Sequence, residues 1–343
     1  MSRKLISRER VRRSITFQVP DRIPFFHRFL EATRRRHPEV VASLEARYPG
    51  DMADSCWHIP PMLIQSGETD DGRQSNDEWG CVRATGIEGL TGLAVVHPLS
   101  DWNALIDYQW PDYSVLCDWE SVPDTIRQHP DQHHIGQIPN LNLFECMQAL
   151  RGFESLMFDL AEKRTELFQL RDRIVDAMLV AVDFWLQTDV DAVGFGDDWG
   201  TQRDMMISPK AWREFFRPAY ARMFEPVKQA GKFIRFHSDG MVLPIIPELI
   251  DLGVDVINVQ QNLIGLDRLK PFRGRVCFLT YMDNQRVLPY GTPADVREHV
   301  RQVFEALGTP EGGVIGYAPI GPDVPPGNME ALYAAYNEFG ALR

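Results

Sequence analysis

The sequence lacks the features that mark membrane-spanning, secreted and disulfide-stabilised proteins. No stretch of its 343 residues approaches the roughly 20 apolar residues that are needed to cross a bilayer. The first residues are basic, but no apolar core of a signal peptide follows them. The five cysteines are odd in number and show no CxxC spacing, which argues against a disulfide framework. These absences favour a cytoplasmic protein.

Basic side chains are too few to balance the acidic ones. The 36 lysines and arginines stand against 48 aspartates and glutamates, which gives a net charge of −12. A field of this sign repels nucleic acid and anionic membranes, so we expect neither as a partner and expect a small-molecule ligand. Hydrophobic residues make up 44% and charged residues 24% of the chain, which is typical of a globular enzyme.

From residue 131 to residue 343, short apolar segments alternate regularly with helical segments. Strand candidates lie at 134–138, 191–196, 233–236, 254–259, 276–279 and 314–317. Such alternation indicates parallel strands joined by right-handed crossovers. An open doubly wound sheet usually carries a glycine-rich phosphate loop, and the sequence has none. We therefore predict a (β/α)₈ barrel, also called a TIM barrel, as a single domain over residues 1–343.

Residues 1–130 depart from this regular pattern. We expect an N-terminal helical extension with a basic helix at about 7–17, and then a first strand at 25–29. Two β-like runs, at 78–84 and 93–96, are separated by glycines. They predict an inserted β-hairpin that walls or covers a site.

Polar side chains follow four successive strand candidates of the regular region. They are GDDWG at 196–200, FHSDG at 236–240, QQN at 260–262 and YMD at 281–283. In a barrel, the residues just after each strand point to the catalytic face. Core packing does not explain this pattern, which therefore predicts a functional site.

His237 and Asp239 are the leading candidates for chemistry at this site. They alternate on an extended segment, so both side chains face the same side. A histidine and a carboxylate that converge can bind a divalent metal ion or act as an acid and a base. In the alternative interpretation, Asp239 only caps the next helix or orients His237 through a hydrogen bond.

Asp197 and Asp198 are adjacent, so only one of them can point into the barrel mouth while the other caps a helix or meets solvent. Desolvated carboxylates have raised pKa values and suit proton transfer, and we favour Asp198 for this role. The further candidates for substrate binding are His27, Arg28, Glu145, Gln202, Gln260 and Asp283. For Arg28 the alternative is a surface ion pair, and for Glu145 it is stabilisation of a helix dipole.

The chain resembles the uroporphyrinogen decarboxylase superfamily over nearly its whole length. The matching segments are RERV at 8–11, PDRIP at 20–24, DEWG at 77–80, DDWGTQ at 197–202, FHSDG at 236–240, GTPADV at 291–296 and NMEAL at 328–332. The resemblance implies a barrel and two alternative activities. One is decarboxylation of uroporphyrinogen without a cofactor. The other is methyl transfer with a methylated corrinoid protein, at a zinc ion that a His-x-Cys pair and a later cysteine hold.

The sequence departs from the decarboxylase pattern in the segment that binds substrate carboxylates. True decarboxylases carry a Met-Arg-Gln-Ala-Gly-Arg segment after the first proline motif, whereas this chain reads FFHRFL at 25–30. One arginine and a net charge of −12 are poorly suited to an octacarboxylate. Decarboxylation of uroporphyrinogen or another carboxylic acid is therefore the second hypothesis.

The methyltransferase pattern matches His237, but Asp239 stands where the paired cysteine is expected. The segment expected to hold the later cysteine, APIG at 318–321, contains no thiol. A zinc ion held by His237 and Asp239 would be bound more weakly and would be more electrophilic than one held by thiolates.

We expect a methyltransferase linked to a corrinoid, with the methylcobamide delivered by a partner protein. A decarboxylase would need no cofactor, and a non-catalytic ligand-binding barrel is a third hypothesis. A homodimer is left open.

Overall fold

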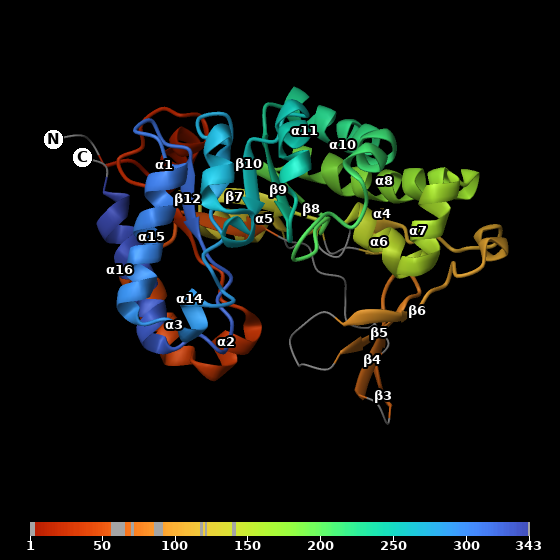
Figure 1. Cartoon of the computed structure of the whole chain (residues 1–343), viewed down its shortest axis with the longest axis horizontal. Helices are drawn as coiled ribbons and strands as arrows, with labels where there is room; N and C mark the ends of the chain where they lie inside the picture. Colours follow the sequence, from red (N-terminus) through yellow and green to blue (C-terminus); the bar gives the residue numbers. More distant parts are fainter. Residues whose placement is uncertain are drawn as a thin grey trace.

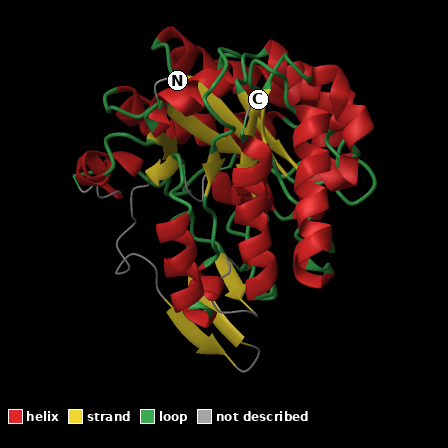
Figure 2. Ribbon diagram, turned by 90° about the vertical axis from the view of Figure 1, so that its left-hand side faces the viewer, coloured by secondary structure: helices red, strands yellow, loops and turns green. Residues whose placement is uncertain are grey.

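The computed structural model describes residues 4–55, 66–69, 72–85, 92–116, 119–120, 122–138 and 142–341. Within these ranges, eight parallel strands follow one another in the order β1-β12-β11-β10-β9-β8-β7-β2, and helices surround them (Figures 1 and 2). The strands are β1 (Phe25–Phe26), β2 (Met52–Ser55), β7 (His133–Gln137), β8 (Ala192–Gly196), β9 (Phe233–Ser238), β10 (Val256–Val259), β11 (Cys277–Leu279) and β12 (Val314–Tyr317). The predicted (β/α)₈ barrel is confirmed.

The helices that cover the barrel come mostly from the regular region, as the sequence pattern predicts. In the described ranges, no helix has both the length and the apolar character that crossing a membrane requires. The α-helices of the described residues are α1 (Ser7–Ile15), α2 (Glu31–Arg36), α3 (Pro38–Arg47), α4 (Tyr113–Leu116), α5 (Val122–Gln128), α6 (Leu143–Arg151), α7 (Phe153–Glu162), α8 (Thr165–Leu186), α9 (Pro209–Ala211), α10 (Arg217–Gln229), α11 (Ile246–Asp251), α12 (Gln261–Ile264), α13 (Leu266–Leu269), α14 (Val287–Tyr290), α15 (Pro293–Leu307) and α16 (Pro326–Gly340).

The inserted β-structure is larger than the predicted hairpin. Four antiparallel strands form a separate sheet that projects from the barrel (Figure 2). They are β3 (Ser66–Thr69), β4 (Gly72–Asn76), β5 (Val82–Thr85) and β6 (Leu93–Val96). The predicted pairing is confirmed by β5 and β6, whereas β3 and β4 were not foreseen because they read SGET and GRQSN, which have no apolar alternation. The run expected from residue 78 instead begins with a turn around Gly80, whose φ is +75°.

Helix α1 closes the amino end of the barrel. Its buried residues Val11 and Ile15 join the apolar cluster inside the barrel, which also contains Ile135 and Ile315. The hydroxyl of Ser14 donates to the carbonyl oxygen of Val314 at 2.8 Å. A small molecule therefore reaches the barrel interior from the carboxyl ends of the strands.

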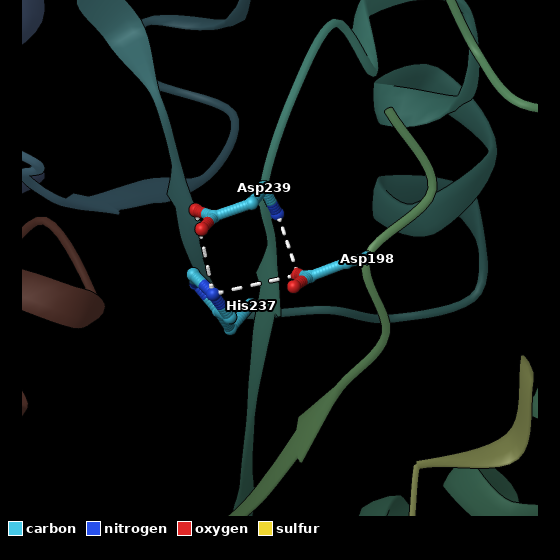
Figure 3. A group of neighbouring side chains, drawn as sticks. All are labelled: Asp198, His237 and Asp239. Atoms are coloured by element: carbon cyan, nitrogen blue, oxygen red, sulfur yellow. Dashed lines mark hydrogen bonds and ion pairs between the residues drawn. The ribbon is translucent and has the colours of Figure 1, made fainter. Parts of the chain in front are cut away.

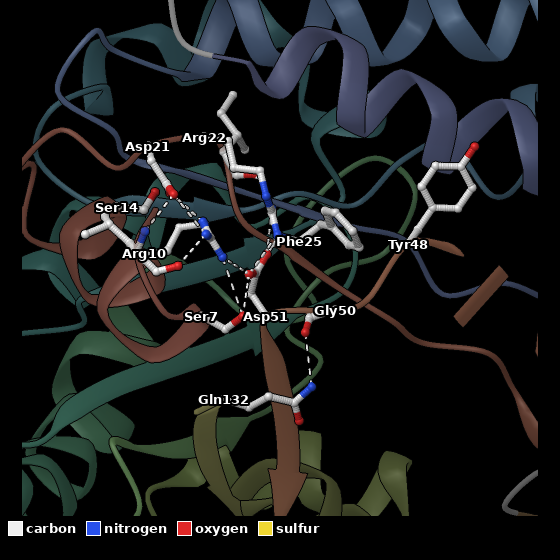
Figure 4. A network of polar contacts seen from close by, with 12 residues as sticks. Ser7, Arg10, Ser14, Asp21, Arg22, Phe25, Tyr48, Gly50, Asp51 and Gln132 are labelled. Carbon is white, nitrogen blue, oxygen red and sulfur yellow. Dashed lines mark hydrogen bonds and ion pairs between the residues drawn. The ribbon is translucent and has the colours of Figure 1, made fainter. Parts of the chain in front are cut away.

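The side chain of Asp51 joins β1 and β2, the two strands at the ends of the sheet order. The strands β1 and β2 are not paired in the sheet, but the Phe25 amide donates to Asp51 Oδ2 at 3.0 Å and the Asp51 amide donates to the Phe25 carbonyl at 2.9 Å. Arg10 Nη1 and Arg22 Nη1 donate to the same carboxylate at 2.6 and 2.7 Å (Figure 4). Asp51 is fully buried, so two guanidinium groups, one backbone amide and the Ser7 hydroxyl replace its hydration.

Replacing Asp51 with asparagine should destabilise the protein by about 3 kcal/mol or more, because it leaves the buried Arg10 and the partly buried Arg22 without their shared carboxylate. Urea unfolding followed by circular dichroism measures this change. The control Glu338→Gln removes an exposed ion pair with Arg297 and should leave the unfolding midpoint nearly unchanged. Equal midpoints for Asp51→Asn and the wild type would contradict the role given to Asp51.

Candidate functional site

Three polar side chains converge at the carboxyl ends of β8 and β9. His237 lies near the end of β9, Asp239 follows that strand, and Asp198 follows β8 (Figure 3). His237 Nε2 is 3.6 Å from Asp198 Oδ1 and 3.5 Å from Asp239 Oδ1. The nearest donor atoms of the three residues lie within 4.8 Å of one another. We call this set the His–Asp–Asp cluster.

A close backbone contact between two glycines holds the two loops of the cluster together. A Cβ atom at Gly200 would lie 2.3 Å from the Met241 nitrogen, and one at Gly240 would lie 2.2 Å from the Gly200 carbonyl carbon. Gly240 also has a φ of +83°, a left-handed conformation that favours glycine. The contact allows the Asp239 amide to donate to Asp198 Oδ1 at 2.9 Å. The glycines therefore bring the Asp198 carboxylate to His237.

Asn258 on β10 fixes which nitrogen of His237 carries the proton. The Asn258 amide group donates to the carbonyl oxygens of Leu279 and Thr280 at 2.8 and 3.1 Å, so its oxygen points the other way. That oxygen lies 2.8 Å from His237 Nδ1, which must therefore donate. In the neutral imidazole, the lone pair of Nε2 then faces the two carboxylates.

The His–Asp–Asp cluster has more acceptors than donors. Asp239 Oδ1 is buried and has no hydrogen-bond partner among the residues that the structure describes. Burial raises the pKa of Asp239, and the nearby charge of Asp198 raises it further while His237 lowers it. Two carboxylates and one imidazole lone pair suit a divalent cation, since metal ligands must be deprotonated. The residues present therefore fit a metal ion with three protein ligands.

Asp197 points away from the cluster and caps helix α6. Its carboxylate accepts the Phe144 amide at 2.9 Å, the Glu145 amide at 3.1 Å and the Tyr220 hydroxyl. Burial, and then the charge of Glu145, raise the pKa of Asp197 well above its ordinary value. As their adjacency predicts, the two neighbouring carboxylates diverge. Asp197 places the start of α6, while Asp198 enters the cluster.

Glu145 lies in the first turn of α6, between the cluster and the inserted sheet. Burial, followed by the charge of Asp198, raises its pKa from 4.5 to about 7. It lines a cavity of about 490 Å³ together with Trp79, Arg83 and His97. The inserted sheet therefore walls a cavity that Glu145 also lines, and the charge of Glu145 acts on the cluster through Asp198.

His27 and Arg28 point to opposite sides of the barrel wall. Phe26 lies inside the barrel, so strand alternation turns His27 outward, where its ring packs 4.7 Å from that of Tyr333. His27 Nε2 contacts the Tyr48 carbonyl oxygen at 2.6 Å. The expectation that His27 binds substrate is therefore wrong. Arg28 lies at the mouth, where it forms an ion pair with Asp54 at 3.2 Å.

The remaining predicted residues support the loops of the site or lie outside it. Gln260 accepts the Gly240 amide at 3.0 Å and so holds the loop that carries Asp239. Asp283 is nearly buried and caps a turn by accepting the amides of residues 285 and 286 at 3.0 and 2.9 Å. Gln202 is exposed on the loop after β8.

Sequence reasoning missed Asn258 and Arg235, although each leaves a signal in the sequence. Each is a polar residue inside a predicted apolar strand, and Arg235 shares the period-two face of His237. A polar side chain at such a position needs a buried partner or a ligand. That requirement could have identified both residues.

The fold and the cluster together define the class of the protein. It is a (β/α)₈ barrel whose candidate site lies at the carboxyl ends of the strands, where barrel enzymes carry their active sites. The family model for uroporphyrinogen decarboxylase (URO-D) matches residues 143–339, which is more than half of the chain. The chain therefore belongs to the uroporphyrinogen decarboxylase family.

Solved structures support the fold over the whole chain. A methyltransferase from Methanosarcina mazei has 15% sequence identity and a TM-score of 0.69, and the match covers 98% of this chain and 99% of that one. A 3-keto-D-glucoside 4-epimerase from E. coli has 12% identity and a TM-score of 0.38 over 65% of this chain and 84% of its own. The second likeness is too distant to bear on function, and the first shows the fold. A search of curated proteins found no match.

In the metal-free protein, the stability should depend on the protonation of Glu145. Between about pH 4.5 and pH 7 the folded chain holds a proton on Glu145 that the unfolded chain has released, so the free energy of unfolding falls as the pH rises. Urea unfolding in the presence of a chelator should show a smaller fall for Glu145→Gln. Asp197 and Asp239 have raised pKa values and contribute with the same sign, so some fall remains.

The control variant Glu225→Gln changes an exposed glutamate on α10 and should keep the wild-type pH dependence. Identical pH dependence for Glu145→Gln and the wild type would show that Glu145 is not protonated in this range.

Proposed function

We propose that this protein is a corrinoid-linked methyltransferase that moves a methyl group to or from a small molecule at the His–Asp–Asp cluster. One observation carries the proposal: His237 Nε2 and two carboxylates converge, and one carboxylate oxygen is buried without a hydrogen-bond partner among the described residues. The methyltransferase branch that the sequence resembles holds zinc at the same strand end through a His-x-Cys pair. Here Asp239 takes the place of the cysteine.

The three cluster residues form a donor set for zinc that differs from the thiolate set. His237 Nε2, an Asp239 oxygen and an Asp198 oxygen would hold the ion, and nitrogen and oxygen are ordinary zinc ligands. Carboxylates transfer less charge to the metal than thiolates do, so this set favours a more electrophilic centre. A zinc ion there would supply positive charge that stabilises negative charge on the substrate heteroatom that loses the methyl group.

Three features of the chain serve such a reaction. Asn258 holds the His237 ring with its lone pair toward the cluster. Glu145, with a pKa of about 7, can hold a proton at neutral pH and donate it to a heteroatom at the mouth. Helix α1 closes the opposite end of the barrel, so a partner protein that carries the corrinoid must approach the carboxyl ends of the strands.

Zinc binding should depend on the cluster and on the residue that orients it. His237→Gln and Asp239→Asn each remove a ligand and should weaken zinc binding at least about tenfold, while Asn258→Leu should weaken it about 10- to 100-fold by releasing the His237 ring. Competition with a chromophoric chelator measures these affinities. Asp204→Asn removes the same charge from the exposed loop after β8 and should bind zinc as the wild type does. Equal affinity in the wild type and His237→Gln would exclude the cluster as the metal site.

Methyl transfer should be visible in the corrinoid spectrum. The zinc-loaded protein, mixed with cob(I)alamin and a panel of O-, N- and S-methylated compounds, should convert the cobalamin to its methylated form with at least one of them. The reverse experiment uses methylcob(III)alamin with thiol and other acceptors. His237→Gln should abolish both reactions, and Asp204→Asn should retain them.

The same preparations test the two alternative functions. Loss of carboxyl groups from uroporphyrinogen, with no change in any cobalamin spectrum, would replace the proposal with a decarboxylase. Turnover of no compound by the zinc-loaded protein would favour a ligand-binding barrel.

A further inference from the structure

Arg235 is a charged residue in the middle of a central barrel strand. It lies on β9 two residues before His237, and strand alternation turns both side chains toward the barrel interior. Its neighbour in register on β8 is Gly194, and the neighbour of His237 is Gly196. At Gly194 the side chains of Gln137 and Ile135 fill the inward position, since a Cβ there would lie 2.5 and 3.0 Å from them, whereas a Cβ at Gly196 would meet no atom closer than 3.5 Å.

The guanidinium group of Arg235 is poorly satisfied by the protein. Its Nε atom is buried without a hydrogen-bond partner among the described residues. Its Nη2 donates one long hydrogen bond, 3.4 Å, to the Asn258 oxygen, which also accepts from His237 Nδ1. An arginine keeps its proton in proteins, so this is an enclosed cation with few acceptors.

Among the described residues, one carboxylate has an appreciable electrostatic interaction with Arg235, and other groups share it. That carboxylate belongs to Asp54, whose oxygens already pair with Arg28 at 3.2 Å and accept from Gln137 Nε2 at 2.5 Å. Burial lowers the pKa of Arg235, and the charge of Arg28 lowers it further, while Tyr317 and Asp54 act in the opposite direction. Two guanidinium groups therefore face one carboxylate in this part of the barrel.

Tyr281 lies beside the cluster and Tyr317 near Arg235, and the centroids of their two rings are 6.3 Å apart. The Tyr281 ring stacks with the His237 ring, with centroids 6.1 Å apart and an interplanar angle of 14°. The Tyr317 ring stacks with Phe26 at 5.7 Å. Two residues along a strand span about 7 Å, so Arg235 lies about that far below His237 in the barrel. A flat molecule of this length would reach both residues.

We propose that Arg235 binds the carboxylate of a small monoanionic substrate, whose other end reaches the His–Asp–Asp cluster. A carboxylate matches the guanidinium geometry through two parallel hydrogen bonds and supplies the missing negative charge. The assignment of the bound anion as the substrate rests on the proposed function, whereas anion binding at Arg235 does not depend on it.

Calorimetric titration of the wild-type protein with benzoate and with benzamide tests the site, because the two probes have the same shape and differ in charge. Benzoate should bind at least about tenfold more tightly than benzamide. Arg235→Met should lose this preference, and Arg235→Lys should keep the charge but lose part of the affinity. Arg203→Met changes an exposed arginine on the loop after β8 and should bind benzoate as the wild type does.

The stability of Arg235→Met separates a binding role from a structural one. Removing an unpaired buried charge should leave the unfolding midpoint equal to or above that of the wild type. A lower midpoint, equal binding of benzoate by the wild type and Arg235→Met, or no benzoate binding by the wild type would each overturn the proposal. If benzoate binding depends on Arg235 but no methylated compound reacts, the anion site stands and the proposed function falls.

Discussion

The buried carboxylate of Asp51 is the contact on which the rest of the barrel depends. The strands β1 and β2 are not paired with each other in the sheet, and Asp51 joins them through the Phe25 backbone and two arginines. The residues that follow this junction include Arg28 on one side and Asp54 on the other, and these two form an ion pair at the mouth. The same two strands therefore carry a structural charge network at the amino end of the barrel and an ion pair at its mouth.

The barrel interior carries two neighbouring sets of unbalanced charge. Around His237, carboxylates exceed the available donors, which suits a cation. Around Arg235, guanidinium groups exceed the available acceptors, which suits an anion. An unpaired buried charge lowers stability unless a ligand compensates it, so these two sets are where the proposed cation and the proposed anion would bind. Proteins that only need a stable core would fill these positions with apolar side chains.

The regular half of the barrel could be predicted from the sequence, whereas the first half could be predicted only in part, namely α1, β1 and the pair β5 and β6. Strands such as β8 and β10 read as continuous apolar segments because both faces are covered. Strand β2 was missed because its four residues, MADS, include the inward-facing Asp54 and give no apolar run. The strands β3 and β4 were missed because their residues are polar and pair only with each other and with β5.

The sequence by itself determined that His237 and Asp239 share a face and that Asp197 and Asp198 diverge, because strand geometry is local and alternates every two residues. Only the tertiary structure decided that Asp198 joins the cluster, that Asn258 sets the proton on His237, and that Arg235 shares the carboxylate of Asp54 with Arg28. These outcomes depend on contacts between distant segments. The approach of Gly200 to Gly240 is one, since it joins loops that follow different strands. The chemistry of the site therefore follows from how the loops pack.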